Sequence, residues 1–108
     1  MNMLYKTNKS YDERRKILRQ TVLLKGCISV SNFNFDAVVY GLSLYGAKIK
    51  LELPINVGTL LKIRIKDKPY IPARIAWTKD GFLGLEFRRS PEHIKSILGN
   101  LGEKLDLA

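Results

Sequence analysis

Apolar and polar residues alternate along most of this chain, and the alternation restarts six times. A period of two predicts half-buried β-strands, because successive side chains of a strand point to opposite faces. The alternating stretches are residues 21–30, 35–40, 47–53, 61–66, 71–78 and 83–87. Short turns separate them, and the strongest hairpin signal is Asp80-Gly81. Parallel strands would need long crossover connections, which this chain lacks. The pattern therefore predicts an all-β fold, a six-stranded antiparallel β-barrel.

After the last stretch the period changes to that of a helix. Ser90 is a typical N-cap, and Pro91 suits the first helical position. Apolar residues then recur at spacings of three and four, at positions 94, 97, 98, 101 and 105. Gly99 and Gly102 weaken such a helix by about 1 kcal/mol each relative to alanine. We expect one C-terminal α-helix whose apolar stripe packs on the barrel or on a partner.

The first 19 residues differ from the rest of the chain. They hold six basic and two acidic residues, a net charge of +4 out of the +9 of the whole chain. Their apolar residues are sparse and show no long periodicity, so we expect much of this arm to be mobile without a ligand. A short helical turn is expected near residues 12–18. The predicted organisation is a basic arm, residues 1–19, followed by a barrel with a C-terminal helix, residues 20–108.

Composition narrows the classes of function. The length of 108 residues fits one domain, and the excess of Lys and Arg favours an anionic partner. With Cys27 and His93 as its single cysteine and histidine, the chain has neither a disulfide framework nor the ligands of the usual zinc sites. It lacks an apolar run of about 20 residues, the length needed to cross a bilayer, and its start has no apolar signal region. We expect a cytoplasmic protein without membrane insertion.

The sequence predicts a binding protein rather than an enzyme. Its acidic residues are scattered, with no pair placed as general acid and base. It has no glycine-rich phosphate loop and no serine-nucleophile motif, and we expect no cofactor.

Two short stretches carry candidate chemistry. In the arm, Arg14, Arg15 and Arg19 lie close together, and guanidinium groups suit bidentate binding of phosphate and stacking on a base. Between the second and third strands, Ser43 offers a hydroxyl, and Gly46 is expected to adopt a positive φ so that the chain can turn. Taken singly, the first stretch is typical of a solvated basic tail and the second of an ordinary Gly-Ser turn.

The order of these motifs resembles the PilZ domain family. The resemblance spans residues 12–101 and combines Arg-x-x-x-Arg before the first strand with x-x-Ser-x-x-Gly between strands two and three. Residues 73–77 (Ala-Arg-Ile-Ala-Trp) and 84–87 (Gly-Leu-Glu-Phe) are similar to the last two strands of the family. PilZ domains are six-stranded barrels, and many bind the bacterial second messenger cyclic di-GMP.

The resemblance also implies roles for particular residues. Arg15 and Arg19 would hold phosphates and stack on guanine, Ser43 and Gly46 would belong to the loop that contacts the base, and Arg14 would favour a stacked pair of nucleotides. Gly41 stands where the family has Asp or Asn. Loss of a charged acceptor costs about 1.5–3 kcal/mol, which weakens binding by roughly ten- to a hundredfold.

Three hypotheses follow, in order of preference. The first is a cyclic di-GMP receptor in which binding orders the arm and signals to a protein partner. The second is a PilZ-like module that has lost the nucleotide and acts by protein–protein interaction. The third, least favoured, is a basic barrel that binds single-stranded nucleic acid, which requires outward aromatic rings among basic residues. Tyr40, Tyr45 and Tyr70 do not line up as such a platform, and Trp77 is expected in the core.

Overall fold

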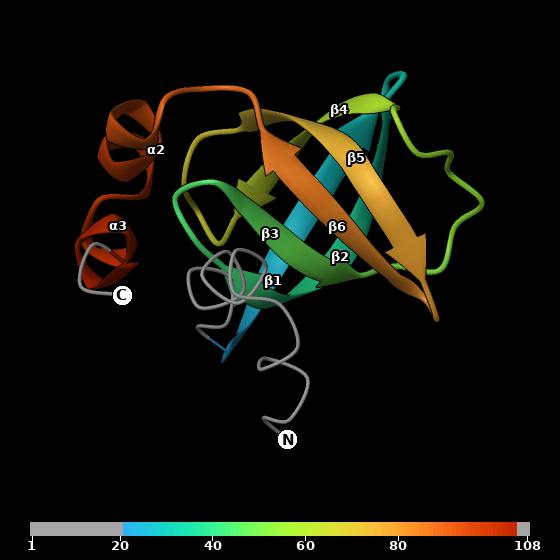
Figure 1. The fold of residues 1–108 in the computed structure, drawn as a ribbon, viewed down its shortest axis with the longest axis horizontal. Coiled ribbons are helices and arrows are strands. Elements are labelled where there is room, and N and C mark those ends of the chain that lie inside the picture. The colour runs from blue at the N-terminus through green and yellow to red at the C-terminus, as the bar shows by residue number, and fades with distance from the viewer. Residues whose placement is uncertain (1–20, 106–108) are drawn as a thin grey trace, which may run out of the picture.

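The inward positions of the alternation are filled by β-branched and other apolar side chains, and they close the sheet on itself. The structure, a computed structural model that describes residues 21–105, is a closed antiparallel barrel (Figure 1). Its strands are β1 (Thr21–Val30), β2 (Phe33–Leu42), β3 (Gly46–Lys50), β4 (Leu60–Ile65), β5 (Ile71–Lys79) and β6 (Phe82–Phe87). Their order around the barrel is β1-β2-β3-β6-β5-β4, and β4 pairs with β1 to complete the ring. The predicted all-β barrel is confirmed.

The core lies inside the barrel and contains mainly isoleucine and leucine. Ile28, Ile49, Ile63 and Ile75 are fully buried, one from each of four strands. Branched side chains suit these positions because they pack well on a pleated, half-buried surface. The alternating partners of these residues, including Lys48, point to the outside.

Most strand boundaries differ from the prediction by one to three residues, and two of the differences have a clear cause. β2 begins at Phe33 instead of residue 35, because Ser31 and Asn32, with φ of 48° and 70°, form a two-residue turn that matches the twist of a hairpin. β3 ends at Lys50, short of residue 53. Lys50 pairs with Phe82, the first residue of β6, so the following residues have no neighbouring strand on that side. Residues 51–59 form a loop instead.

The predicted helical segment at the C-terminus is confirmed, and it is divided into two helices where one was expected. They are α2 (Pro91–Leu98) and α3 (Asn100–Leu105), and Gly99, with φ of 59°, ends the first. Gly102 allows the two helices to touch, since a Cβ there would lie 2.7 Å from the Lys95 carbonyl oxygen. The two glycines thus shape a helical hairpin.

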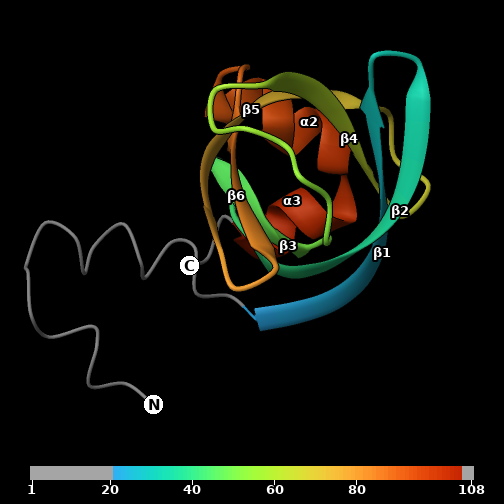
Figure 2. The ribbon, with the colours of Figure 1, turned by 90° about the vertical axis from the view of Figure 1, so that its right-hand side faces the viewer.

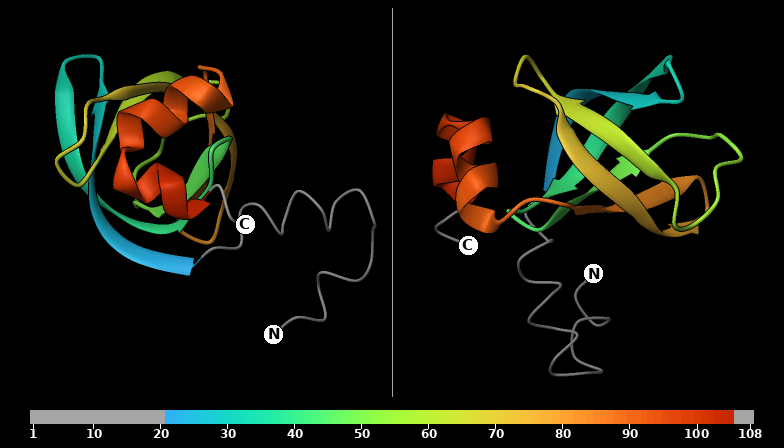
Figure 3. Two further views of the ribbon diagram at one scale, coloured as in Figure 1. Left: turned by 90° about the vertical axis from the view of Figure 1, so that its left-hand side faces the viewer. Right: turned by 90° about the horizontal axis from the view of Figure 1, so that it is seen from above.

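The helices cover one end of the barrel, and the 51–59 loop lies at the other. Ser90 caps α2 as predicted, its hydroxyl accepting a hydrogen bond from His93 N at 3.2 Å. Ile94 and Leu98 are fully buried where α2 meets the barrel, and Figure 3 shows both helices across this end. Figure 2 views the barrel from the opposite end, with the loop in front.

None of the helices formed by residues 21–105 has the length and apolar character needed to cross a membrane.

Candidate nucleotide-binding site

The β2–β3 turn is built around the buried side chain of Ser43. Its hydroxyl accepts hydrogen bonds from Tyr45 N at 3.0 Å and Gly46 N at 3.2 Å. Its own backbone N donates to the Gly46 carbonyl at 3.0 Å. The residue is 1% exposed. Both lone pairs of the hydroxyl are therefore engaged in the turn, and its remaining capacity toward a ligand is the hydroxyl hydrogen.

Gly46 is required at this turn for a different reason from the one predicted. The glycines of residues 21–105 with positive φ are Gly58, Gly81 and Gly99, so the expectation of a positive φ at Gly46 was wrong. Instead, β3 passes so close to β6 that a Cβ on Gly46 would overlap the Leu85 carbonyl oxygen. Only glycine has the volume to fit this contact.

Gly41 lies where three strands meet. It pairs with Thr21 of β1 on one side and with Lys48 of β3 on the other, and the register of β2 shifts just before it. Its φ is not positive. Since directly paired residues share a face, position 41 faces the same side as Lys48. The Lys48 ammonium lies 4.7 Å from the centre of the Phe82 ring.

This pairing places the start of β1 beside the turn. The described part of the chain therefore begins next to Gly41. The predicted arginines, Arg14, Arg15 and Arg19, and the expected helical turn near residues 12–18 lie outside the described residues. The structure brings Gly41, Ser43 and Gly46 together in one connection.

Comparison with known sequences decides the family. The sequence profile of the PilZ domain matches residues 13–102. This chain belongs to the PilZ domain family. A search of curated proteins gives no significant match.

Solved structures share the fold of this PilZ domain. The PilZ domain of CeSA from a cellulose-synthesizing bacterium has a TM-score of 0.62 and 19% sequence identity, covering 79% of this chain and 94% of the other. The PlzA protein of Borreliella burgdorferi, in complex with c-di-GMP, has a TM-score of 0.56 and 16% identity, covering 80% of this chain and 35% of PlzA. An uncharacterized Legionella protein has a TM-score of 0.52 and 18% identity, covering 75% of this chain and 89% of the other.

Trp77 does not lie in the core of this PilZ domain, so that prediction was wrong. The register of β5 against β6 shifts between Ile75 and Trp77, and this bulge turns the indole to the outside. There Trp77 lies across Gly84 and is 41% exposed. A Cβ on Gly84 would overlap the indole ring. The alternation could not reveal a bulge, because one extra residue reverses the faces of those that follow.

Cys27 takes part in a small cluster on the outside of the barrel. Tyr70 donates a hydrogen bond from its hydroxyl to Cys27 Sγ at 3.5 Å, and the Arg64 guanidinium lies 5.2 Å from the Tyr70 ring centre. The hydrogen bond to Cys27 raises the pKa of Tyr70, because it stabilises the protonated phenol. Among residues 21–105, no three His, Cys, Asp or Glu side chains gather closely enough to hold a metal ion.

Sequence reasoning missed Lys48 as a neighbour of position 41. The two residues are seven apart in the chain and meet only through the register of β2 with β3. A hairpin prediction that starts from the pairing of Leu42 with Ala47 would have found them, because the register shift lies beyond Gly41, toward Val39.

Proposed function

We propose that this PilZ domain is a cyclic di-GMP receptor that binds the nucleotide between its N-terminal arm and the β2–β3 turn. Arg15 and Arg19 hold phosphates and stack on guanine, and Arg14 favours a stacked nucleotide pair. Planar guanidinium groups suit these tasks because they are permanently charged and form paired hydrogen bonds to phosphate. Ser43 and Gly46 shape the turn that faces the base.

The pairing of Thr21 with Gly41 carries the proposal. Arg19 precedes Thr21 by two residues, and two residues of extended chain span at most about 7 Å. The length of this connection therefore allows the last arginine of the motif to reach the turn. The fold shared with PlzA, which was solved in complex with c-di-GMP, gives further support.

The proposed signal is a change in the arm, without catalysis. Ligand phosphates neutralise the repulsion among Arg14, Arg15 and Arg19, which allows the arm to pack on the barrel. The new surface then contacts a protein partner in the cytoplasm.

Titration calorimetry with cyclic di-GMP, with GTP as the control ligand, tests the proposal. Arg15→Ala and Arg19→Ala should each abolish binding and leave the thermal midpoint of the free protein nearly unchanged. Lys16→Ala, which removes a charge from the same arm, should bind almost as well as the wild type. Binding should weaken with added salt, because exposed charged contacts are screened. Undiminished binding by both arginine variants would contradict the clamp.

Gly41→Asp provides a second test of the same site. The new carboxylate would face the side of the barrel that carries Lys48, and it supplies the acceptor found in the family. Because the φ of Gly41 is not positive, aspartate meets no left-handed backbone there. We expect affinity to rise about tenfold, and because position 41 is buried, the thermal midpoint measured alongside reports the cost of desolvating the carboxylate. Gly41→Ala, which adds no acceptor, should bring no gain.

One observation favours the alternative, a PilZ module that acts by protein–protein interaction without the nucleotide. Gly41 has no acceptor, and Ser43 cannot replace it because both of its lone pairs already bind backbone N–H groups. If neither the wild type nor Gly41→Asp binds cyclic di-GMP while both are folded, this alternative is correct.

A further inference from the structure

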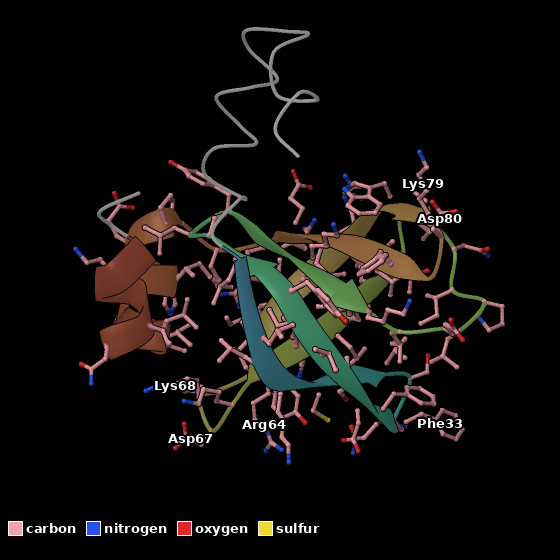
Figure 4. The ribbon with its side chains drawn as sticks, turned by 90° about the horizontal axis from the view of Figure 1, so that it is seen from below. Phe33, Arg64, Asp67, Lys68, Lys79 and Asp80 are labelled. Carbon is pink, nitrogen blue, oxygen red and sulfur yellow. The ribbon has the colours of Figure 1, made fainter. Side chains whose placement is uncertain are left out.

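A row of cations that form no ion pair with the described side chains runs along the outer face of β4 and β1. Lys62 and Arg64 project outward from β4, Lys66 follows at its end, and Lys25 lies opposite Lys66 on β1. The backbone N of Lys66 donates to the Lys25 carbonyl at 2.8 Å. We call these four residues the basic ladder. Figure 4 shows Arg64 pointing away from the barrel wall, on the side opposite Lys79.

Among the described residues, the cations of the basic ladder have like charges as neighbours. The ion pair among the described side chains joins Arg74 and Glu86, and neither belongs to the ladder. Lys25 and Lys66 oppose each other across two strands, an arrangement in which like charges repel. Asp36 and Asp67 are the acidic residues of this face, whereas the Lys68 ammonium lies beside Gly99 at the end of α2. The face thus retains an excess of two positive charges.

Lys66 also has a backbone conformation that is unusual for lysine. Its φ is 56°, in the left-handed region that glycine and asparagine adopt most readily. A lysine there is less stable than either of those residues. The chain therefore keeps a cation at this position despite both electrostatic repulsion and backbone strain.

Large aliphatic side chains are exposed on the same face. Leu60 precedes Lys62 by two residues on β4 and is 60% exposed, and Leu23 precedes Lys25 by two residues on β1 and is 69% exposed. Val38 of β2, directly paired with Lys25, is also exposed. Cations interspersed with exposed aliphatic groups are the composition of surfaces that bind at a lipid interface.

We propose that the basic ladder and its flanking aliphatic residues form a docking face for an anionic lipid surface. Lys25, Lys62, Arg64 and Lys66 contact lipid headgroups, and Leu23 and Leu60 enter the interface. The charges removed in the test, those of Lys62 and Lys66, lie on and just after β4 and not on the β2–β3 turn, so the test leaves the residues of the proposed nucleotide site unchanged.

The same face is poorly suited to nucleic acid. Binding of a single strand uses exposed aromatic rings as stacking platforms, but Arg64 lies over the Tyr70 ring. The wall is convex, and the shallow cavity of about 410 Å³ found in residues 21–105 lies elsewhere, between residues 51–54 and 78–83. An extended planar surface fits a convex charged wall better than a strand that needs a groove.

Co-sedimentation of the full chain with lipid vesicles tests the proposal in the absence of nucleotide. The probes are vesicles of phosphatidylcholine containing phosphatidylglycerol and vesicles of phosphatidylcholine alone. The test variant is Lys62→Gln/Lys66→Asn, and the control is Lys79→Gln/Arg88→Gln, which removes the same charge from elsewhere. The N-terminal arm is present in every protein, so its contribution cancels in the comparison.

The wild type should sediment with the vesicles that contain phosphatidylglycerol. It should remain in the supernatant when the vesicles are phosphatidylcholine alone. Each ladder charge removed should lower the partition coefficient about fivefold, so the test variant should lose about 25-fold. The control should lose much less. Because Lys66→Asn also relieves backbone strain, the test variant should unfold at a temperature no lower than that of the wild type, which separates lost binding from lost folding.

Leu60→Ser examines the aliphatic part of the face, with Val57→Ser as its control. Val57 is similarly exposed, at 55%, but lies in the 51–59 loop. Only Leu60→Ser should weaken vesicle binding.

Three results would overturn the proposal: no binding by the wild type, equal losses in the ladder variant and its charge-matched control, or unchanged vesicle binding by the ladder variant accompanied by loss of binding to a labelled single-stranded oligonucleotide. The last would assign the ladder to nucleic acid.

Discussion

The β2–β3 turn and the β5–β6 turn reverse the chain at opposite ends of the barrel by different means. In the β5–β6 turn, Asp80 and Gly81 adopt φ of 54° and 83°, which suffices to join two antiparallel strands. In the β2–β3 turn, the Ser43 side chain replaces missing backbone partners, and Gly46 is pressed against β6. The first turn is a local device of two residues. The second depends on a strand almost forty residues later in the chain, and it is the one that the proposed function uses.

Replacing one glycine of each turn by alanine should show the difference between the two turns most clearly. In Gly46→Ala the new Cβ would overlap the Leu85 carbonyl, so the backbone of β3 or β6 must move, and we expect a loss of about 3 kcal/mol in the free energy of unfolding. In Gly81→Ala the Cβ would meet the flexible side chain of Glu52 at 3.3 Å, and the cost is the left-handed backbone, about 1 kcal/mol. Urea denaturation measures both. Equal losses would show that the two turns rest on the same kind of constraint.

Side-chain substitutions should show the same contrast, with a larger loss of stability in the β2–β3 turn than in the β5–β6 turn. Ser43→Ala leaves two backbone N–H groups without an acceptor in a buried turn, so it should destabilise the fold by about 2 kcal/mol. Asp80→Asn keeps a residue that tolerates positive φ, and its effect should stay within about 0.5 kcal/mol. Thermal unfolding of both variants provides the comparison. A Ser43→Ala protein as stable as the wild type would mean that the hydroxyl serves the ligand alone.

Gly84→Ala extends the comparison to a glycine that meets a side chain. Its Cβ would overlap the indole of Trp77, which can swing outward, whereas the Leu85 carbonyl that blocks Gly46 is fixed in the sheet. We expect a loss near 1 kcal/mol and a red shift of the emission of Trp77, the single tryptophan of the chain. An unshifted spectrum would show that the indole stays in place and that the backbone moves instead.

The alternation of apolar and polar residues was sufficient to predict most of the strands, because it shows which side chains are buried in the folded protein. A strand that buries one face must place Ile63 and Ile65 inside and Lys62 and Arg64 outside, whichever strands lie beside it. The caps were equally local, since the Ser90 hydroxyl needs only the first turn of its own helix. The prediction failed where a single residue changed the geometry of an element. The bulge before Trp77 reversed the face of the indole, and a single residue at Gly99 divided the helix in two.

For the candidate site, the sequence alone determined which residue types are present. The tertiary structure decided what they can do. Ser43 was correctly placed in a turn, but its burial and its two backbone partners follow from how β2 and β3 meet. Gly46 was singled out for backbone freedom, whereas the approach of β6 is what requires it. The pairings of Gly41 with Thr21 and Lys48, and of Lys25 with Lys66, join residues 7 to 41 positions apart. Such neighbours depend on strand register, and register is set by the packing of the whole barrel, which no local pattern specifies.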